Sequence, residues 1–334
     1  MPVVHSTSAV RAGQLLFTSA VLGTRGTRLV DKFSDLDEEG RSFATGMLSV
    51  DGWIESIGAQ FWQAMKNLQV ILDEGGSSMG QIVLLSFYSR QMHHHHLINS
   101  LRSAAFRPFA APPNTGVQVP ENPGNALMQA SAVGFIPDKS GWTRRLIRAG
   151  DGSHSMSHYD LGVQVGPFLM TGDFVPGSKR LQRGIAGYDD VPAFPRSLRP
   201  TGLIRGSYEE TVRAQAWFLY ENIRDVLAQN GGRLEDIARL RVYLVDVADA
   251  AAFAEVHKTV MGNHRPVMTV SIVDKLGRSD FRVAIEIMAV IPALISDALY
   301  KPRYLSTDAE DVLDLGSPGV AIGPYVFLGN SSKK

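Results

Sequence analysis

The sequence of 334 residues contains no cysteine. This absence excludes disulfide bonds, thiolate metal ligands and a cysteine nucleophile from any function of the chain. An excess of charge of one sign is also lacking, because 33 lysines and arginines balance 33 aspartates and glutamates. A chain without net charge has no overall field that would attract nucleic acid or an anionic membrane. We therefore expect no nucleic-acid partner.

Long hydrophobic runs are missing as well. No apolar stretch approaches the roughly 20 residues that a membrane-spanning helix needs. The first residues, MPVVHSTSAVRAG, lack the basic start and the apolar core of a signal peptide. The hydrophobic content of 44% and the charged content of 20% are those of a globular protein. We expect a cytoplasmic protein without a membrane partner, long enough for two domains.

One long segment of the chain is present twice, at 62–88 and at 217–243. Every match between the copies has the same separation along the chain as Trp62 and Trp217, which we call the repeat spacing. In each copy apolar residues recur three and four apart, as in an amphipathic helix. A glycine follows, Gly76 or Gly231, as is typical of a helix C-terminus, and a β-branched and aromatic run then predicts a strand. A helix, a stop and a strand in fixed register indicate a tandem duplication.

Each copy of this segment lies within a longer repeated order of elements. The order is two strands joined at a glycine turn, a long helix, a strand, a second helix and two closing strands. We predict these elements at 3–20, 53–74, 81–89, 92–107, 115–119 and 126–136, and again at 159–174, 208–229, 236–245, 250–262, 267–273 and 281–292. We therefore predict a first domain at 1–138, a linker at 139–154 and a second domain at 155–294.

The remaining residues, 295–334, form a predicted C-terminal extension. Within it, VAIGPYVFLGN at 320–330 is similar to VQVGPFLMTGD at 163–173 and to VRAGQLLFTSA at 10–20. The similarity predicts the first hairpin of a third repeat, although a chance apolar strand is the alternative for so short a match. A hairpin without a sheet of its own is expected to pair with the edge of another sheet.

The order of elements resembles the Rid/YjgF family of reactive-intermediate deaminases. The resemblance covers both copies and includes the opening hairpin, Asn67-Leu68 or Asn222-Ile223 before the glycine, and Ile-Glu-Ile at 285–287. It implies an α+β fold of two tandem Rid/YjgF-like (chorismate mutase-like) domains, each a mixed β-sheet with two helices on one face. In that family three such units pack their sheets into a barrel, and active sites lie in the clefts between units.

The resemblance also implies a chemistry, since the best-known members of the family hydrolyse imines and enamines without metal or cofactor. A family glutamate on the last strand positions or activates the attacking water, and its position falls on Glu286 in the second copy and Gln129 in the first. A family arginine clamps the substrate carboxylate, but its positions fall on Val267 and Asn114. Because the clamp is missing from both copies, a small amino-acid-derived imine is a poor guess for the substrate.

Other positions of the family pocket are matched in one copy only. The pocket tyrosine is matched by Tyr159, the strand-end serine by Ser19 and the asparagine of the second helix by Asn99, while the second copy offers His257 there and Thr269 at a position that is often cysteine. Arg265, two residues before the lost clamp, is a candidate replacement. We predict Glu286, His257 and Tyr159 as catalytic residues, and Ser19, Asn99, Asn114, Gln129, Arg265 and Thr269 as substrate-binding residues.

Two of these residues have structural alternatives. Glu286 lies between two isoleucines, where a carboxylate is either a tuned acid or base or a structural group paired with an arginine such as Arg265 or Arg282. His257 is either a general base or a solvated helix histidine. For the four histidines at 93–96 we predict no metal site, because only two of them share a helical face and no acidic third ligand lies at motif spacing.

These observations predict a cofactor-independent hydrolase or deaminase for a small imine, enamine or related unsaturated metabolite, with Glu286 as acid or base in a site at a domain or subunit interface. The alternatives are a chorismatase-like hydrolase, which also resembles paired Rid domains, and a catalytically silent small-molecule-binding protein. Ribonuclease activity, reported for some members of the family, fits poorly with zero net charge. Because two units cannot close a barrel of three, we expect a homo-oligomer, most simply a homotrimer.

Overall fold

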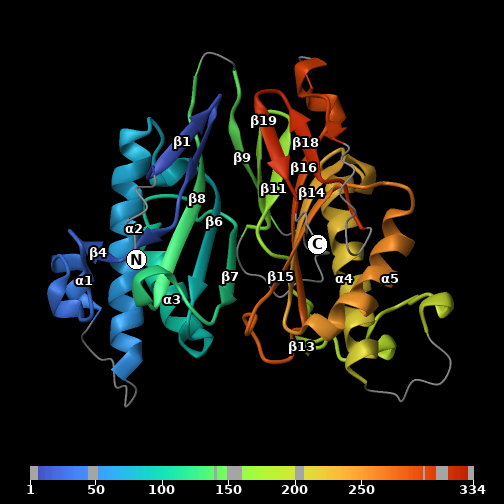
Figure 1. Cartoon of the computed structure of the whole chain (residues 1–334), viewed down its shortest axis with the longest axis horizontal. Coiled ribbons are helices and arrows are strands. Elements are labelled where there is room, and N and C mark those ends of the chain that lie inside the picture. Colours follow the sequence, from blue (N-terminus) through green and yellow to red (C-terminus); the bar gives the residue numbers. More distant parts are fainter. Residues whose placement is uncertain are drawn as a thin grey trace. The chain divides into compact units, whose positions relative to one another are not determined.

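The computed structural model of the chain describes residues 7–43, 52–138, 141–148, 160–199, 207–295, 298–305 and 315–329. The chain divides into two compact units, Met1–Arg144 and Arg145–Lys334. Each unit carries one mixed sheet with one long and one shorter helix on one face (Figure 1). The predicted α+β fold of two Rid-like domains is therefore confirmed. None of the described helices has the length and hydrophobicity that crossing a membrane requires.

The sheet of the first unit has the strand order β1-β2-β8-β6-β7, and β3 pairs with the beginning of β8. All pairings are antiparallel except the parallel pair β6 and β7. The elements are β1 (Ala9–Ala12), β2 (Leu15–Thr18), β3 (Val21–Leu22), β4 (Thr24–Arg25), β5 (Arg28–Leu29), α1 (Glu38–Ser42), α2 (Gly52–Glu74), η2 (Met79–Gln81), β6 (Ile82–Ser89), η3 (Met92–His94), α3 (His95–Ala105), β7 (Asn114–Gln118) and β8 (Met128–Phe135).

The sheet of the second unit has the order β15-β14-β16-β11-β10-β9, in which β14 and β15 are parallel. Strand β9 lies within the segment that the sequence predicted as a linker. The elements are β9 (Arg144–Ile147), β10 (Gly162–Val165), β11 (Phe168–Thr171), β12 (Gly177–Ser178), β13 (Arg183–Gly184), α4 (Tyr208–Gln229), η7 (Leu234–Asp236), β14 (Ile237–Leu244), η8 (Val247–Asp249), α5 (Ala250–Met261), β15 (Val267–Ile272) and β16 (Val283–Val290). A separate three-stranded sheet consists of β17 (Arg303–Leu305), β18 (Gly319–Ile322) and β19 (Tyr325–Leu328).

The two units repeat each other element by element, which confirms the predicted duplication. The repeat spacing relates η2 to η7, β6 to β14, η3 to η8 and β8 to β16, in each case at both ends of the element. It also relates the last residues of the long helices α2 and α4. Even the irregularity in strand pairing is repeated, between Ile82 and Leu84 in one unit and between Ile237 and Arg239 in the other.

A buried glutamine on each long helix ties the helix to the beginning of the last strand. In the first unit, Gln60 Oε1 accepts a hydrogen bond of 2.7 Å from the Leu127 N–H. In the second unit, Gln215 Oε1 accepts one of 2.8 Å from the Arg282 N–H. Both the donors and the acceptors are related by the repeat spacing. In both units this hydrogen bond therefore fixes the position of the long helix along the sheet.

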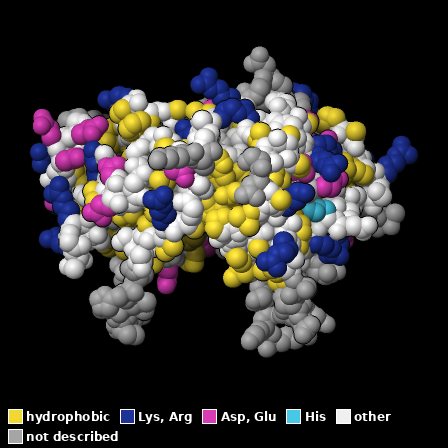
Figure 2. Space-filling view, turned by 90° about the horizontal axis from the view of Figure 1, so that it is seen from above, with side chains coloured by type: hydrophobic (Ala, Val, Ile, Leu, Met, Phe, Trp, Pro, Cys, Tyr) yellow, Lys and Arg dark blue, Asp and Glu magenta, His cyan; other side chains and the backbone are white. Residues whose placement is uncertain are grey.

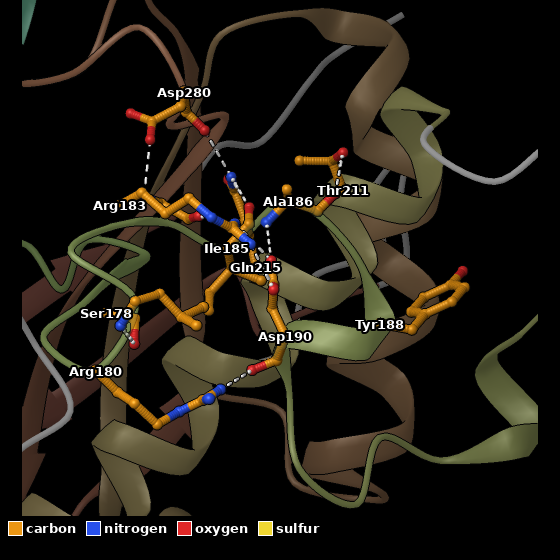
Figure 3. A network of polar contacts seen from close by, with 12 residues as sticks. Ser178, Arg180, Arg183, Ile185, Ala186, Tyr188, Asp190, Thr211, Gln215 and Asp280 are labelled. Carbon is orange, nitrogen blue, oxygen red and sulfur yellow. Dashed lines mark hydrogen bonds and ion pairs between the residues drawn. The ribbon is translucent and has the colours of Figure 1, made fainter.

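Gln215 also fixes the segment between β11 and α4, which adds Phe174, Ile185, Val191, Phe194 and Leu198 to the hydrophobic core. Its Nε2 donates to the carbonyls of Ile185 and Asp280, at 2.8 and 2.7 Å. Beside it, Asp190 accepts two hydrogen bonds of 2.7 Å from the Arg183 guanidinium and one of 2.7 Å from the Ala186 N–H (Figure 3). Polar contacts therefore act together with buried apolar side chains in holding this segment.

We expect Gln215→Leu to lower the free energy of unfolding by about 3 kcal/mol, because the apolar side chain leaves one buried N–H and two carbonyls without their partner. Urea unfolding followed by circular dichroism measures the change. Gln229→Leu is the control, since Gln229 is exposed at the end of the same helix. The control should stay within about 0.5 kcal/mol of wild type. A Gln215→Leu variant as stable as wild type would contradict the role given to this side chain.

Candidate functional site

The face of the second sheet that lies opposite its helices carries a row of polar side chains. Arg241 on β14 is paired in register with Glu286 on β16 and with Thr269 on β15. The strand neighbours Leu240, Val242, Ile285 and Ile287 all belong to the hydrophobic core under the helices. Because side chains alternate along a strand, Arg241, Thr269 and Glu286 point to the other face at the same level. Three adjacent strands thus present a cation, a hydroxyl and a carboxylate side by side.

Glu286 is paired with an arginine that the sequence analysis did not name. Arg241 Nη1 lies 3.4 Å from Glu286 Oε1, and only 5% of Glu286 is exposed. Arg282, one of the partners considered from the sequence, instead binds Asp249 with two hydrogen bonds of 2.9 and 3.0 Å. The Arg241–Glu286 ion pair holds the buried carboxylate on the sheet face opposite the helices. An arginine in the middle of the apolar run of β14 was the signal that could have identified this partner.

The counterpart of Glu286 in the first unit is Ser131, so the assignment of Gln129 to this position is wrong by two residues. Strands β8 and β16 are related by the repeat spacing at both of their ends. Ser86 pairs with Ser131 as Arg241 pairs with Glu286. The pairing irregularity near the start of β6 and β14 is shared, and it keeps the two ladders in the same register. The first unit therefore has a pair of hydroxyls where the second has an ion pair.

The comparison of Asn114 with Val267 is wrong by one residue. Asn114 pairs with Leu85, whereas the corresponding Leu240 pairs with Met268. In the same register Thr269 corresponds to Thr115. A shift of one residue along a strand moves a side chain to the opposite face, so Asn114 and Val267 do not share a position.

His257 corresponds to Arg102 of the first unit, and not to Asn99. The short helices η3 and η8 and the starts of α3 and α5 follow the repeat spacing, which brings His257 to Arg102. Both side chains are buried. His257 Nε2 donates to the Leu315 carbonyl at 3.0 Å, so its Nδ1 is unprotonated and accepts the Tyr220 hydroxyl at 2.6 Å. With both nitrogens occupied by core partners, His257 has the geometry of a structural histidine.

Burial lowers the pKa of His257 to about 4, from an ordinary value of 6.5. Between pH 6.5 and pH 4 the His257 imidazole therefore stays neutral in the folded chain but becomes protonated in the unfolded chain. The resulting stability is fully present above pH 6.5 and is lost as the pH falls toward 4. A shift of this size corresponds to about 3 kcal/mol at the acidic end of the window.

We expect the free energy of unfolding of wild type to decrease by about 3 kcal/mol more than that of His257→Gln between pH 7 and pH 4. Urea unfolding at a series of pH values measures this difference. His96→Gln serves as the control, because His96 is exposed on the corresponding region of the first unit. The control should show the same pH dependence as wild type. Parallel curves for wild type and His257→Gln would contradict the buried neutral state.

The other predicted site residues occupy separate places in the structure. Ser19 follows β2, and its N–H and hydroxyl both donate to the Ser8 carbonyl. The side-chain oxygens of Asn99 and Gln129 are buried without a hydrogen-bond partner. Arg265 is exposed, and Tyr159 lies outside the described residues. Among the residues that the structure describes, no three His, Asp or Glu side chains lie together as metal ligands do.

Comparison with known proteins bears on this second unit in particular. Residues 201–291 match the family Endoribonuclease L-PSP. The matched range contains α4, β14, α5, β15 and β16, and thus the whole row from Arg241 to Glu286. The second unit is similar to the Rid/YjgF, or endoribonuclease L-PSP-like, superfamily over this range. The resemblance seen in the sequence is therefore confirmed.

Individual relatives of this Rid/YjgF-like chain match only part of it. Over 80 residues it is 30% identical to the mitochondrial protein mmf2 of Schizosaccharomyces pombe, and the matched region covers 24% of this chain and 64% of that protein. A YjgF/YER057c/UK114 family structure from Mycobacterium tuberculosis is 23% identical, covers 45% of this chain and 100% of its own, and has a TM-score of 0.32. RidA from the Antarctic bacterium Psychrobacter is 20% identical, covers 44% and 99%, and has a TM-score of 0.34.

Proposed function

We propose that the second unit is a cofactor-independent hydrolase or deaminase for a small imine, enamine or related unsaturated metabolite. The observation that carries this proposal is Glu286, a buried carboxylate beside Arg241 and level with Thr269 on the sheet face opposite the helices. A buried carboxylate with a specific charged partner is typical of a group used for acid–base chemistry. Family membership supports a small-molecule site of this general kind.

In the proposed reaction Glu286 acts as the base that activates water. Its carboxylate accepts a proton from water while the water oxygen bonds to the imine carbon. The protonated carboxyl then returns the proton to the nitrogen, which gives a carbinolamine. Glu286 next takes the proton of the carbinolamine hydroxyl and delivers it to the nitrogen as the carbon–nitrogen bond breaks, so that a carbonyl compound and ammonia leave. Arg241 orients the Glu286 carboxylate, and the Thr269 hydroxyl offers a hydrogen bond at the same level.

The first unit lacks the groups for this reaction. Ser86 and Ser131 stand where the second unit has Arg241 and Glu286, and hydroxyls supply neither the base nor the compensating charge. We therefore assign the chemistry to the second unit alone. The substrate-binding roles of Ser19, Asn99, Asn114, Gln129 and Arg265 and the catalytic role of Tyr159 stay predictions, as does the cytoplasmic location. The homotrimer is the assembly expected from the resemblance, and the interface proposed below is an alternative to it. For His257 we propose a structural role in place of the catalytic one.

A chorismatase-like hydrolase is the second candidate, and one observation favours it. Such an enzyme needs arginines to bind a substrate with two carboxylates. Arg239 and Arg241 lie two residues apart on β14, so their side chains point to the same face of the sheet. The Arg239 guanidinium lies over the ring of Phe327, 5.8 Å from its centre. A ribonuclease is not favoured, because side chains of both signs of charge are exposed on the face that Figure 2 shows. A catalytically silent binding protein is the third candidate, and measurable turnover of a substrate would exclude it.

We expect Glu286→Gln to lower kcat by about 10²–10⁴-fold, because the amide keeps the shape of the side chain but cannot accept the proton. Ammonia release from a panel of small imines generated in solution measures turnover. Glu235→Gln, an exposed carboxylate change on η7 of the same unit, is the control and should leave kcat unchanged. A folded Glu286→Gln variant that retains its activity would reassign this carboxylate to a structural role.

We expect Arg241→Met to change catalysis in a way that separates the two candidate functions. If Arg241 only orients Glu286, kcat falls for every substrate, whether or not the substrate carries a carboxylate. If Arg241 binds a substrate carboxylate, KM rises for carboxylate-bearing substrates and changes little for neutral ones. Arg233→Met, an exposed arginine before η7, is the control. Unchanged kinetics in Arg241→Met would exclude both roles.

A further inference from the structure

The hairpin of β18 and β19 is a third copy of the hairpin that opens each unit. The three hairpins share one register, in which Ala9 pairs with Thr18, Gly162 with Thr171 and Gly319 with Leu328. Each turn begins with a glycine at positive φ, which is 54° at Gly13, 52° at Gly166 and 58° at Gly323. A glycine at the first position is what a tight two-residue turn of this kind requires. The geometry therefore supports a third repeat over a chance strand.

The resemblance continues beyond the turn on both sides of the hairpin. The residue after each second strand donates its N–H to the residue before the first strand, from Ser19 to Ser8, from Gly172 to Leu161 and from Gly329 to Pro318. Strand β17 lies beside β18 as β9 lies beside β10. The three-stranded sheet β17-β18-β19 thus repeats the half-sheet β9-β10-β11.

The third hairpin differs from the other two at its outer edge, which is the side of its second strand that faces away from its first strand. In the first unit β8 occupies the outer edge of β2, and in the second unit β16 occupies that of β11, both antiparallel and in equivalent register. No strand within the described part of the chain pairs with the outer edge of β19. Ile322 and Tyr325 flank the turn, so the N–H and carbonyl groups of Val326 and Leu328 point away from β18.

The two faces of this small sheet differ in their surroundings. On the inner face Val320, Ile322, Tyr325 and Phe327 are buried, and the Tyr325 ring meets Phe168 of the second sheet at 5.4 Å between centres. On the outer face Val326 and Leu328 are 60% and 65% exposed. The hairpin is therefore held by one apolar face while it presents a second apolar face at an open edge.

The outer edge of β19 lacks the charges, prolines and bulges that protect many exposed strands. Natural edge strands carry charged residues, prolines or bulges that prevent pairing with another chain. The segment SPGVAIGPYVFLG at 317–329 contains no charged residue, and its prolines lie outside β19. An uncharged, apolar and unpaired edge of this kind is a template for an added strand.

We propose that the β19 edge is an interface at which β19 of a second copy of this chain pairs antiparallel about a two-fold axis. The internal repeats indicate that an antiparallel strand belongs on this edge. A second β19 fits it without burying a charge, whereas the edge strands β1 and β9 carry Arg11, Arg144 and Arg145. With Phe327 on the axis, Val326 of each copy lies opposite Leu328 of the other, so the outward N–H and carbonyl groups and the exposed side chains meet together.

The experiment compares the native mass of the full chain with that of the double variant V326K/L328K by light scattering over a range of concentrations. Wild type should reach twice the chain mass of 36.4 kDa, and the variant should stay at one chain mass because four lysines cannot meet across the axis. Both changed side chains are exposed, so folding of the single chain should be retained, which circular dichroism checks. Val247→Lys is the matched control, since Val247 is 70% exposed on η8 and should leave the mass unchanged.

Three outcomes would overturn the proposal. The first is a wild-type chain that remains at one chain mass at all concentrations. The second is an oligomer that V326K/L328K does not dissociate. The third is an assembly with an odd number of chains, such as the homotrimer expected from the sequence, because pairing of β19 with itself closes with two copies.

Discussion

The antiparallel pairing of β14 with β16 is the constraint on which the candidate site depends. An irregularity at the start of this pairing moves the register, and from Arg239 onward each residue of β14 has a fixed partner on β16. That register, and no contact near the site itself, places Arg241 opposite Glu286. The same irregularity in the first unit places Ser86 opposite Ser131. The duplicated units therefore share the same strand pairing. They differ at two facing positions, where the second unit has a charged pair and the first unit has two hydroxyls.

The sequence predicted the fold well because its signals were local. Helical spacing, the glycines at helix ends and the alternation of strands each depend on a few neighbouring residues, and repetition at one spacing reinforced all of them. The duplication, the element order and the two-helix sheets follow from these signals. The opening hairpins were predictable for the same reason, since Gly13, Gly166 and Gly323 mark turns that need a positive φ.

The candidate site was predicted less well, because its members meet through pairing between strands. Matching short motifs placed the counterpart of Glu286 at Gln129, two residues from the position that the hydrogen-bonded ladder selects. The partner of Glu286 was missed for a related reason, since α5 and β15 separate Arg241 from Glu286 along the chain. His257 had a plausible catalytic identity, but its bonding partners Tyr220 and Leu315 lie 37 and 58 residues away. Whether a histidine is catalytic or structural depends on its burial and its hydrogen-bond partners, and neither follows from the residue type alone.

The contacts of His257 also connect the core of the second unit with its C-terminal segment. By donating to the Leu315 carbonyl, His257 holds the chain where Ser317 forms a parallel bridge to Val267 at the edge of the second sheet. From there the chain enters β18, and the returning strand β19 places Phe327 under the guanidinium of Arg239. Arg239 stands two residues from Arg241 on the same face of β14. The buried histidine thus helps to hold the segment that leads into the third hairpin, and the hairpin in turn supports one of the two cations that face the candidate site. This chain of contacts gives the C-terminal extension a physical link to the site, although none of its residues belongs to the ion pair.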